Sequence, residues 1–165
     1  MKVLVAYMSQ TGNTKKIAEA IYEAIPAPKE IMRVEEVTSL EGYDLSFLGF
    51  PMHALGPDEP VMNFLKTHIK GQTIALFITH ASPENNPPLQ GWLQKFKDAA
   101  VGANIVGLFN CQGEMSEAIA NYLLKHPDPQ RQEWGKARHT TLGQPDATRI
   151  EKARVFAREI MKRFE

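Results

Sequence analysis

Apolar residues along the chain occur in two patterns: short continuous runs, and longer segments in which they recur at helical spacing. The continuous runs predict strands that are buried on both faces, as in a parallel sheet. One segment, residues 30–37, instead alternates apolar and polar residues, which predicts a less buried strand nearer the sheet edge. The predicted strands span residues 2–7, 30–37, 43–50, 73–79 and 104–110.

The segments with helical spacing lie between and after these strands. Ile25-Pro26 ends the first helix, because the residue before a proline avoids the helical conformation. In the last helix, Thr148 and Glu151 fit the pattern of a capping box. Parallel neighbours need crossover connections, so the alternation predicts an α/β fold with helices on both faces of the sheet. The predicted helices span residues 13–24, 61–69, 89–100 and 146–164.

Composition narrows the class of protein. The 165 residues suit one domain, and 19 basic against 19 acidic residues give no net charge. A neutral chain favours neither nucleic acid nor an anionic membrane as a partner. The single cysteine, Cys111, cannot form an internal disulfide, which is typical of a reducing compartment. No apolar run approaches the ~18 residues of a membrane-spanning helix, and no secretion signal is evident, so we expect a cytoplasmic protein.

Four polar loops follow the strongest predicted strands: SQTGNT, PMHALGP, THASPENNP and NCQGEM. The carboxyl ends of parallel strands meet at one edge of the sheet, where ligands of such folds bind. The loops are rich in hydroxyl groups and nearly uncharged. This edge therefore suits a large planar ligand with one anionic end.

The first loop, SQTGNT, leads directly into a predicted helix. A helix start offers unpaired backbone N–H groups and a dipole that favours an anion. Gly12 allows a close bend, and the side chains around it can donate further hydrogen bonds. The spacing fits neither a Walker loop nor G-x-G-x-x-G. A capped turn with surplus polar residues is the simpler alternative. The candidate side-chain donors are Ser9, Thr11, Asn13 and Thr14.

The segment VAYMSQTGNTKKIAEAI, residues 5–21, closely resembles the flavodoxin signature, in which S-x-T-G-N-T cradles the phosphate of flavin mononucleotide (FMN). YDLSFLGFP (43–51) is similar to the family's third strand and flavin-covering loop, and residues 143–160 resemble its closing helix. The resemblance implies a flavodoxin-like domain over residues 1–165, with five parallel strands in order 2-1-3-4-5. It also implies non-covalent FMN and electron transfer.

The resemblance places FMN on three loops. It also implies that a peptide of the second loop turns its carbonyl toward flavin N5 on reduction. Leu55–Gly56 is the peptide that can turn, because glycine tolerates either sign of φ, whereas Pro57 fixes its own φ. No catalytic residue or metal site is predicted. The candidate cofactor-binding residues are Ser9, Gln10, Thr11, Gly12, Asn13, Thr14, Pro51, Met52, His53, Ala54, Leu55, Gly56, Thr79, His80, Ala81 and Ser82.

The chain departs from the family pattern in three ways. It is neutral, whereas carrier flavodoxins are usually acidic. Its ring-binding loops hold no tryptophan or tyrosine, only His53 and His80. A long elaboration, residues 111–143, separates the fifth strand from the last helix. We expect it to contain a helix at Glu114–Lys125 that packs on the outside of the domain through Met115, Ile119 and Leu123.

Several residues keep two interpretations. His53 lies against the flavin or caps a proline-rich loop, and His80 contacts the ring or is a hydrogen-bonded structural histidine. Cys111 is expected to be a partly buried thiol, and Trp92 and Trp134 fit helix packing better than cofactor stacking.

Three functions fit the sequence. The first is an FMN electron carrier with a redox partner protein. The second is an FMN-dependent, NAD(P)H-linked reductase of a small-molecule acceptor. The third is an accessory protein that kept the fold without flavin.

Overall fold

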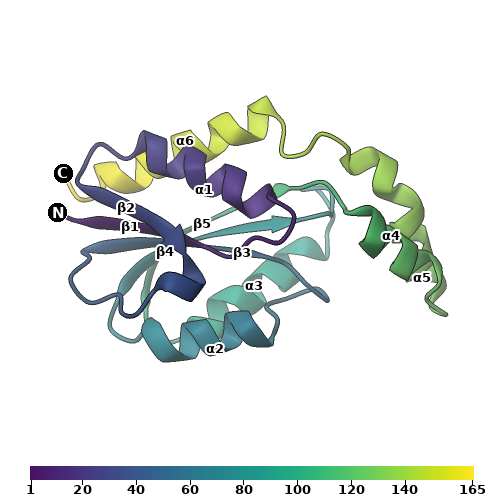
Figure 1. Ribbon diagram of the computed structural model, residues 1–165, viewed down its shortest axis with the longest axis horizontal. Coiled ribbons are helices and arrows are strands. Elements are labelled where there is room, and N and C mark those ends of the chain that lie inside the picture. Colours follow the sequence, from purple (N-terminus) through teal and green to yellow (C-terminus); the bar gives the residue numbers. More distant parts are fainter.

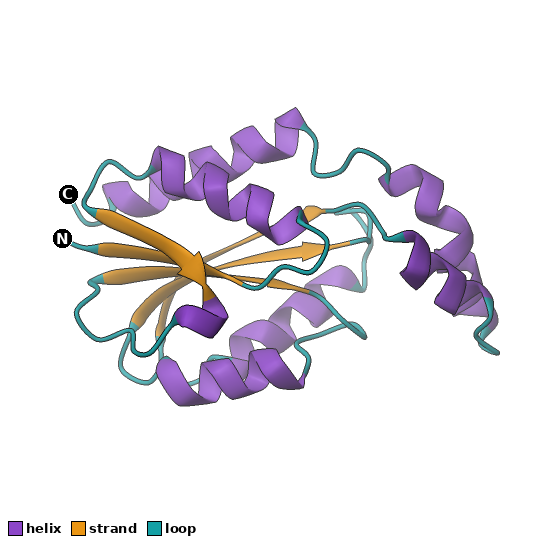
Figure 2. Ribbon diagram, viewed as in Figure 1, coloured by secondary structure: helices purple, strands orange, loops and turns teal.

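A computed structural model describes residues 1–165 as a parallel sheet with helices on both faces (Figures 1 and 2). The strand order is β2-β1-β3-β4-β5, and every neighbouring pair is parallel. This confirms the predicted fold class and strand order. The strands are β1 (Val3–Tyr7), β2 (Lys29–Arg33), β3 (Leu45–Pro51), β4 (Thr73–His80) and β5 (Asn104–Gln112).

The helices form two covering layers and one projection. The helices α1 (Asn13–Ala24) and α6 (Ala147–Lys162) cover one face, and α2 (Glu59–His68) and α3 (Leu89–Ala99) cover the other (Figure 2). The projection lies beyond the carboxyl ends of the strands (Figure 1). It comprises α4 (Glu117–Leu124), α5 (Pro129–Lys136) and a 3₁₀ helix (Ala137–Thr141). No helix combines the length and apolar character needed to span a membrane.

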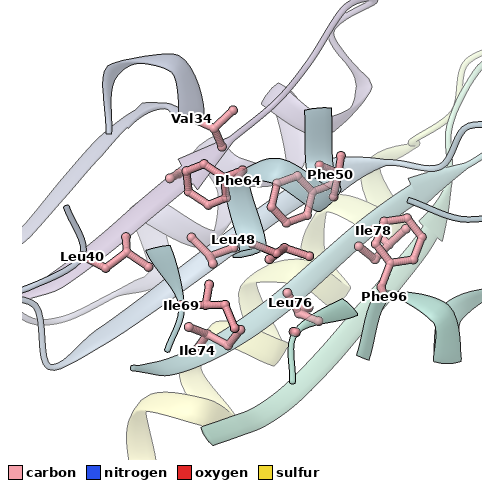
Figure 3. Close-up of a cluster of buried hydrophobic side chains, with 14 of the residues drawn as sticks. Val34, Leu40, Leu48, Phe50, Phe64, Ile69, Ile74, Leu76, Ile78 and Phe96 are labelled. Carbon is pink, nitrogen blue, oxygen red and sulfur yellow. The ribbon is translucent and has the colours of Figure 1, made fainter. Parts of the chain in front are cut away.

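Two apolar clusters hold the helices to the sheet. Successive residues of β4 alternate between them: Leu76 packs beneath α2 and α3 (Figure 3), and Phe77 packs beneath α1 and α6. Both side chains are fully buried. This explains why the sequence of β4 shows a continuous apolar run rather than an alternation, since both faces exclude water.

Gly49 lies where two strands of the sheet leave no room for a side chain. It pairs with Phe77 on the neighbouring strand, and a Cβ at this position would lie 1.9 Å from the Phe77 ring. Only glycine therefore leaves room for the ring that fills the space beneath α1 and α6.

The predicted strand 30–37 is shorter than expected. It ends at Arg33, and a 3₁₀ turn spans Val34–Glu36. The Arg33 backbone N–H donates to the Glu36 carboxylate at 2.8 Å, which closes this turn. The buried Val34 and Val37 owe their spacing to the turn rather than to a strand.

The predicted cap of the last helix is also wrong. The helix begins at Ala147, and the Asp146 carboxylate accepts a hydrogen bond from the Arg149 backbone N–H at 3.0 Å. An aspartate that directly precedes the first turn is a strong N-cap, and it takes the place expected of Thr148.

The elaboration differs from its prediction at both its start and its packing. Cys111 and Gln112, expected to begin the elaboration, are instead the last two residues of β5. The helix begins only at Glu117, because the Ser116 hydroxyl accepts a hydrogen bond from the Ile119 N–H and so caps the helix. Of the three residues expected to pack, Met115 is buried and Leu123 is half-buried, but Ile119 is 47% exposed, and Ala120 is buried in its place.

Candidate functional site

The loops after β1, β3, β4 and β5 lie together at the carboxyl edge of the sheet, beside the projecting helices (Figure 1). A buried hydrogen bond connects the first and third of them: Thr14 Oγ1 lies 2.8 Å from Thr79 Oγ1. A backbone bond connects the second and third, from Met52 N–H to the Thr79 carbonyl at 2.8 Å. The structure therefore brings the three predicted loops to one place.

The β1–α1 loop ends in an open helix start. Gly12 is the N-cap of α1, with a left-handed φ of 97°, and no side chain caps the helix. Within the loop, Gly12 N–H donates to Ser9 Oγ at 3.1 Å. The N–H groups of Thr11, Asn13 and Thr14 donate no hydrogen bond within the chain. Unpaired donors at a helix start, where the dipole is positive, form an anion-binding site.

The side chains around this loop are used unequally. The Thr14 and Thr79 hydroxyls form one hydrogen bond, in which one of them donates and the other accepts. The accepting hydroxyl keeps its own hydrogen and can donate it to a further group. The Asn13 amide, expected to face the anion, donates to the Glu114 carbonyl at 2.9 Å. A Cβ on Gly113 would lie 2.6 Å from the Asn13 amide nitrogen, so glycine permits this close contact between the loop and the segment after β5.

Arg33 is a neighbour of the loop that sequence reasoning missed. Its guanidinium donates to the Ser9 carbonyl at 3.3 Å and lies 5.7 Å from the centre of the Tyr7 ring. Arg33 is the last residue of β2, which pairs with β1, so topology alone brings this cation beside the loop. Only the strand order, and no local motif, could have indicated it.

The β3–α2 loop contains a strained turn. Ala54 and Leu55 have φ values of 48° and 65°. His53 and Gly56 exchange two backbone hydrogen bonds, at 3.1 and 3.2 Å, which close the turn. Positive φ at both central residues defines a type I′ turn, which normally holds asparagine and glycine. Gly56, predicted as the residue that tolerates positive φ, lies outside the left-handed region.

Two histidine nitrogens in these loops are buried without a hydrogen-bond partner: Nε2 of His53 and Nδ1 of His80. His80 is 6% exposed, and its Nε2 lies 2.9 Å from the Asn110 side-chain oxygen. Burial lowers the pKa of His80 and favours its neutral form. A buried polar atom without a partner is costly, and such atoms mark sites where a further group belongs.

An ion pair connects the β4–α3 loop to helix α6. Arg149 of α6 donates to both carboxylate oxygens of Glu84, each at 2.7 Å. Burial alone would raise the pKa of Glu84, but hydrogen bonds from Arg149 and the Gln112 backbone outweigh it and lower that pKa. Neither Glu84 nor Arg149 was predicted, because their partners lie 65 residues apart in sequence.

The remaining candidates, Trp92, Trp134 and Cys111, have contacts that fit a role in packing. Trp92 of α3 and Trp134 of α5 meet edge to face, 6.2 Å between ring centres, which anchors the projecting helices. Burial raises the pKa of Cys111 to about 12, so its thiol is protonated at neutral pH. No three His, Cys, Asp or Glu side chains are arranged to bind a metal ion.

Comparison with known proteins defines the class. The model of the flavodoxin domain family matches residues 4–158, and the chain belongs to this family. It is 35% identical over 171 residues to the flavodoxin-like domain-containing protein BilS of Clostridioides difficile (strain CD3). The alignment covers 98% of this chain and 97% of that relative.

Solved structures share the fold at low sequence identity. Oxidised flavodoxin 2 from Bacillus cereus superposes with a TM-score of 0.65 at 19% identity, covering 99% of this chain and 100% of that one. A flavoprotein from Lactobacillus acidophilus NCFM in complex with FMN gives a TM-score of 0.55 at 20% identity. That match covers 73% of this chain and 97% of the flavoprotein.

Proposed function

We propose that this protein binds FMN non-covalently at the carboxyl edge of its sheet and transfers electrons between a donor and an acceptor. The β1–α1 loop carries the proposal, because its unpaired N–H groups at the start of α1 form a site for a phosphate. Family membership and the FMN complex of a structural neighbour support the same ligand. FMN would supply the redox chemistry, and the chain would hold and orient it.

The donor set fits the anionic end of FMN. Three backbone N–H groups are free, the Thr14–Thr79 pair leaves one hydroxyl able to donate, and Arg33 adds a positive charge beside the loop. Hydrogen bonds from such donors to a charged oxygen are short and about twice as strong as neutral ones. This chain thus binds the phosphate mainly through its backbone.

The second and third loops fit the polar, planar end of FMN. Each presents one buried imidazole nitrogen without a partner, from His53 and His80. An isoalloxazine ring carries hydrogen-bond donors and acceptors along one edge, so these nitrogens would be satisfied by it. Both loops lack tryptophan and tyrosine, and the chain would hold the ring by hydrogen bonds and apolar contact rather than by aromatic stacking.

The proposal is tested first by the purified protein itself. We expect a yellow protein whose heat-released flavin co-migrates with FMN in chromatography. Photoreduced protein should then pass electrons to a one-electron acceptor such as ferricyanide, with turnover that disappears when the flavin is removed. A colourless protein that does not take up added FMN would contradict the proposal.

A second function is favoured by one observation. The projecting helices α4 and α5 lie at the same edge as the loops, and Asn13 of the β1–α1 loop bonds directly to the segment that leads into them (Figure 1). Helices beside the cofactor could shape a pocket for a small substrate of an NAD(P)H-linked reductase. Bleaching of the flavin by NADPH alone, without a partner protein, would favour the reductase, and its absence would favour the carrier.

A further inference from the structure

An apolar groove runs along α6, beside the edge strand β5. Phe109 of β5 and Phe156 of α6 form its floor, with ring centres 5.7 Å apart. Both rings are only partly buried, and Val155 beside them is 41% exposed. No element of the chain covers this groove.

The adjoining strand edge is unusually open to pairing. Edge strands normally carry charged residues or proline, which prevent association with another chain. The nine residues of β5, NIVGLFNCQ, include neither. Arg163 covers one position by donating to the Val106 carbonyl at 2.5 Å. At the end of the strand the Glu84 carboxylate accepts a hydrogen bond from Gln112 N–H at 3.4 Å, and between these two positions no side chain bonds to the backbone of residues 107–111.

Two charges flank the apolar centre of the groove. Lys152 and Glu159 both line it, one helical turn before and one turn after the Val155–Phe156 pair. Neither side chain forms an ion pair or hydrogen bond within the chain, whereas the neighbouring Glu151 binds two arginines of α6. The groove thus has an apolar centre with an unpaired positive charge at one end and an unpaired negative charge at the other.

This arrangement is self-complementary. A two-fold interface places residue i of one copy against residue j of the other, and j against i. If two α6 helices cross antiparallel at Val155, each Lys152 faces Glu159 of the second copy. Two ion pairs then enclose one apolar contact, and no charge is buried alone.

We propose that the α6–β5 groove is the interface of a homodimer, in which a second copy of this chain lies antiparallel along α6. The inference is independent of the proposed flavin chemistry. Two strands, β3 and β4, separate β5 from β1, so the dimer leaves the β1–α1 loop accessible.

Charge reversal tests this geometry. Sedimentation velocity should show a dimer for the wild-type protein, and Lys152→Glu or Glu159→Lys should raise its dissociation constant about tenfold or more, because each places like charges in contact twice. The double variant Lys152→Glu/Glu159→Lys restores both pairs in reversed order and should restore the dimer. Both substituted positions are exposed, and circular dichroism of each variant should match that of the wild type.

Other outcomes overturn the proposal. A wild-type protein that stays monomeric at all concentrations has no such interface. Single variants that remain dimeric, or a double variant that stays dissociated, exclude the antiparallel pairing. Met62→Glu, on exposed α2 at the opposite face of the sheet, is the matched control. It should leave the dimer intact, and dissociation by Met62→Glu alone would place the interface elsewhere.

Discussion

The β1–α1 and β3–α2 loops reverse the chain at the same edge of the sheet, but they do so in opposite ways. The first bends at Gly12, which adopts a positive φ at no steric cost, and the N–H groups of Thr11, Asn13 and Thr14 stay free. The second bends at Ala54 and Leu55, which are forced into positive φ, and its backbone closes on itself between His53 and Gly56. An anion needs open backbone donors, so we infer that the relaxed loop holds the phosphate and the strained loop shapes the ring end.

The largest expected effect concerns the relaxed loop. Thr14→Val removes a hydroxyl in the first turn of α1 that pairs with the Thr79 hydroxyl. We expect FMN binding to weaken by about 1.5–3 kcal/mol, the usual value for a hydrogen bond to a charged group. Riboflavin binding, which involves no phosphate, should change little. Fluorescence titration of the apo-protein measures both.

The control for this variant is Thr67→Val. Thr67 is exposed on α2, and its hydroxyl bonds only to the Asn63 carbonyl of its own helix. It should leave both affinities unchanged. Equal losses of FMN and riboflavin affinity in Thr14→Val would show that Thr14 acts on the fold of the site rather than on the phosphate.

An intermediate effect is expected at the ion pair behind the β4–α3 loop. The pKa of Glu84 is lowered in the folded protein, so its contribution to stability is present above the ordinary value of 4.5 and is lost as the pH falls below it. Glu84→Gln should reduce the free energy of unfolding by about 1 kcal/mol at neutral pH, as for other partly exposed pairs. Below pH 4.5 the two proteins should converge. Urea unfolding across this pH range measures the difference, and parallel curves would contradict it.

A smaller effect, of opposite sign, is expected in the strained loop. Ala54→Gly removes only an exposed methyl group and relieves a left-handed alanine, which costs about 1–2 kcal/mol. Part of this gain is offset by the entropy of glycine in the unfolded chain, about 0.5–1 kcal/mol. We expect a net stabilisation of roughly 0.5–1 kcal/mol in chemical denaturation.

A second alanine distinguishes relief of strain from a general glycine effect. Ala118 is exposed on α4 with ordinary helical backbone, and Ala118→Gly should destabilise by about 1 kcal/mol. If both variants destabilise the protein, the turn at Ala54 is not strained.

The smallest effect is expected at Gly56, despite its prominence in the sequence. Its φ is not positive, and an added Cβ would approach only the flexible Lys95 side chain, at 3.1 Å. Gly56 is buried, but only the Lys95 side chain has to shift, and alanine also lowers the entropy of the unfolded chain, so Gly56→Ala should change the free energy of unfolding by less than about 1 kcal/mol. A loss above about 1 kcal/mol would show that the loop needs glycine at position 56.

The contrast between the loops also explains what the sequence could predict. The strands and their parallel arrangement follow from local hydrophobic patterns and the need for crossovers, as the continuous run of β4 illustrates, whereas the strand order came from the resemblance to flavodoxins. The β1–α1 loop is equally local, because glycine and the helix start that follows it are neighbours in sequence. Both were therefore predictable from short segments.

The rest of the site depends on contacts between distant segments. Arg33 reaches the first loop only because β2 pairs with β1. Arg149 fastens a loop that precedes it by 65 residues. The turn at Ala54 and Leu55 contradicts local preference, since alanine and leucine disfavour positive φ. Two backbone hydrogen bonds between His53 and Gly56 hold the turn, and residue preferences alone do not indicate it.

The central claim is that the β1–α1 loop binds a phosphate, and the most direct test compares two ligands that differ only there. Isothermal titration of wild-type apo-protein with FMN and with riboflavin measures the contribution of this group. The free N–H groups and the Thr14 hydroxyl predict that FMN binds at least about 3 kcal/mol more tightly, more than a hundredfold in affinity. Equal affinity for the two ligands would contradict the account.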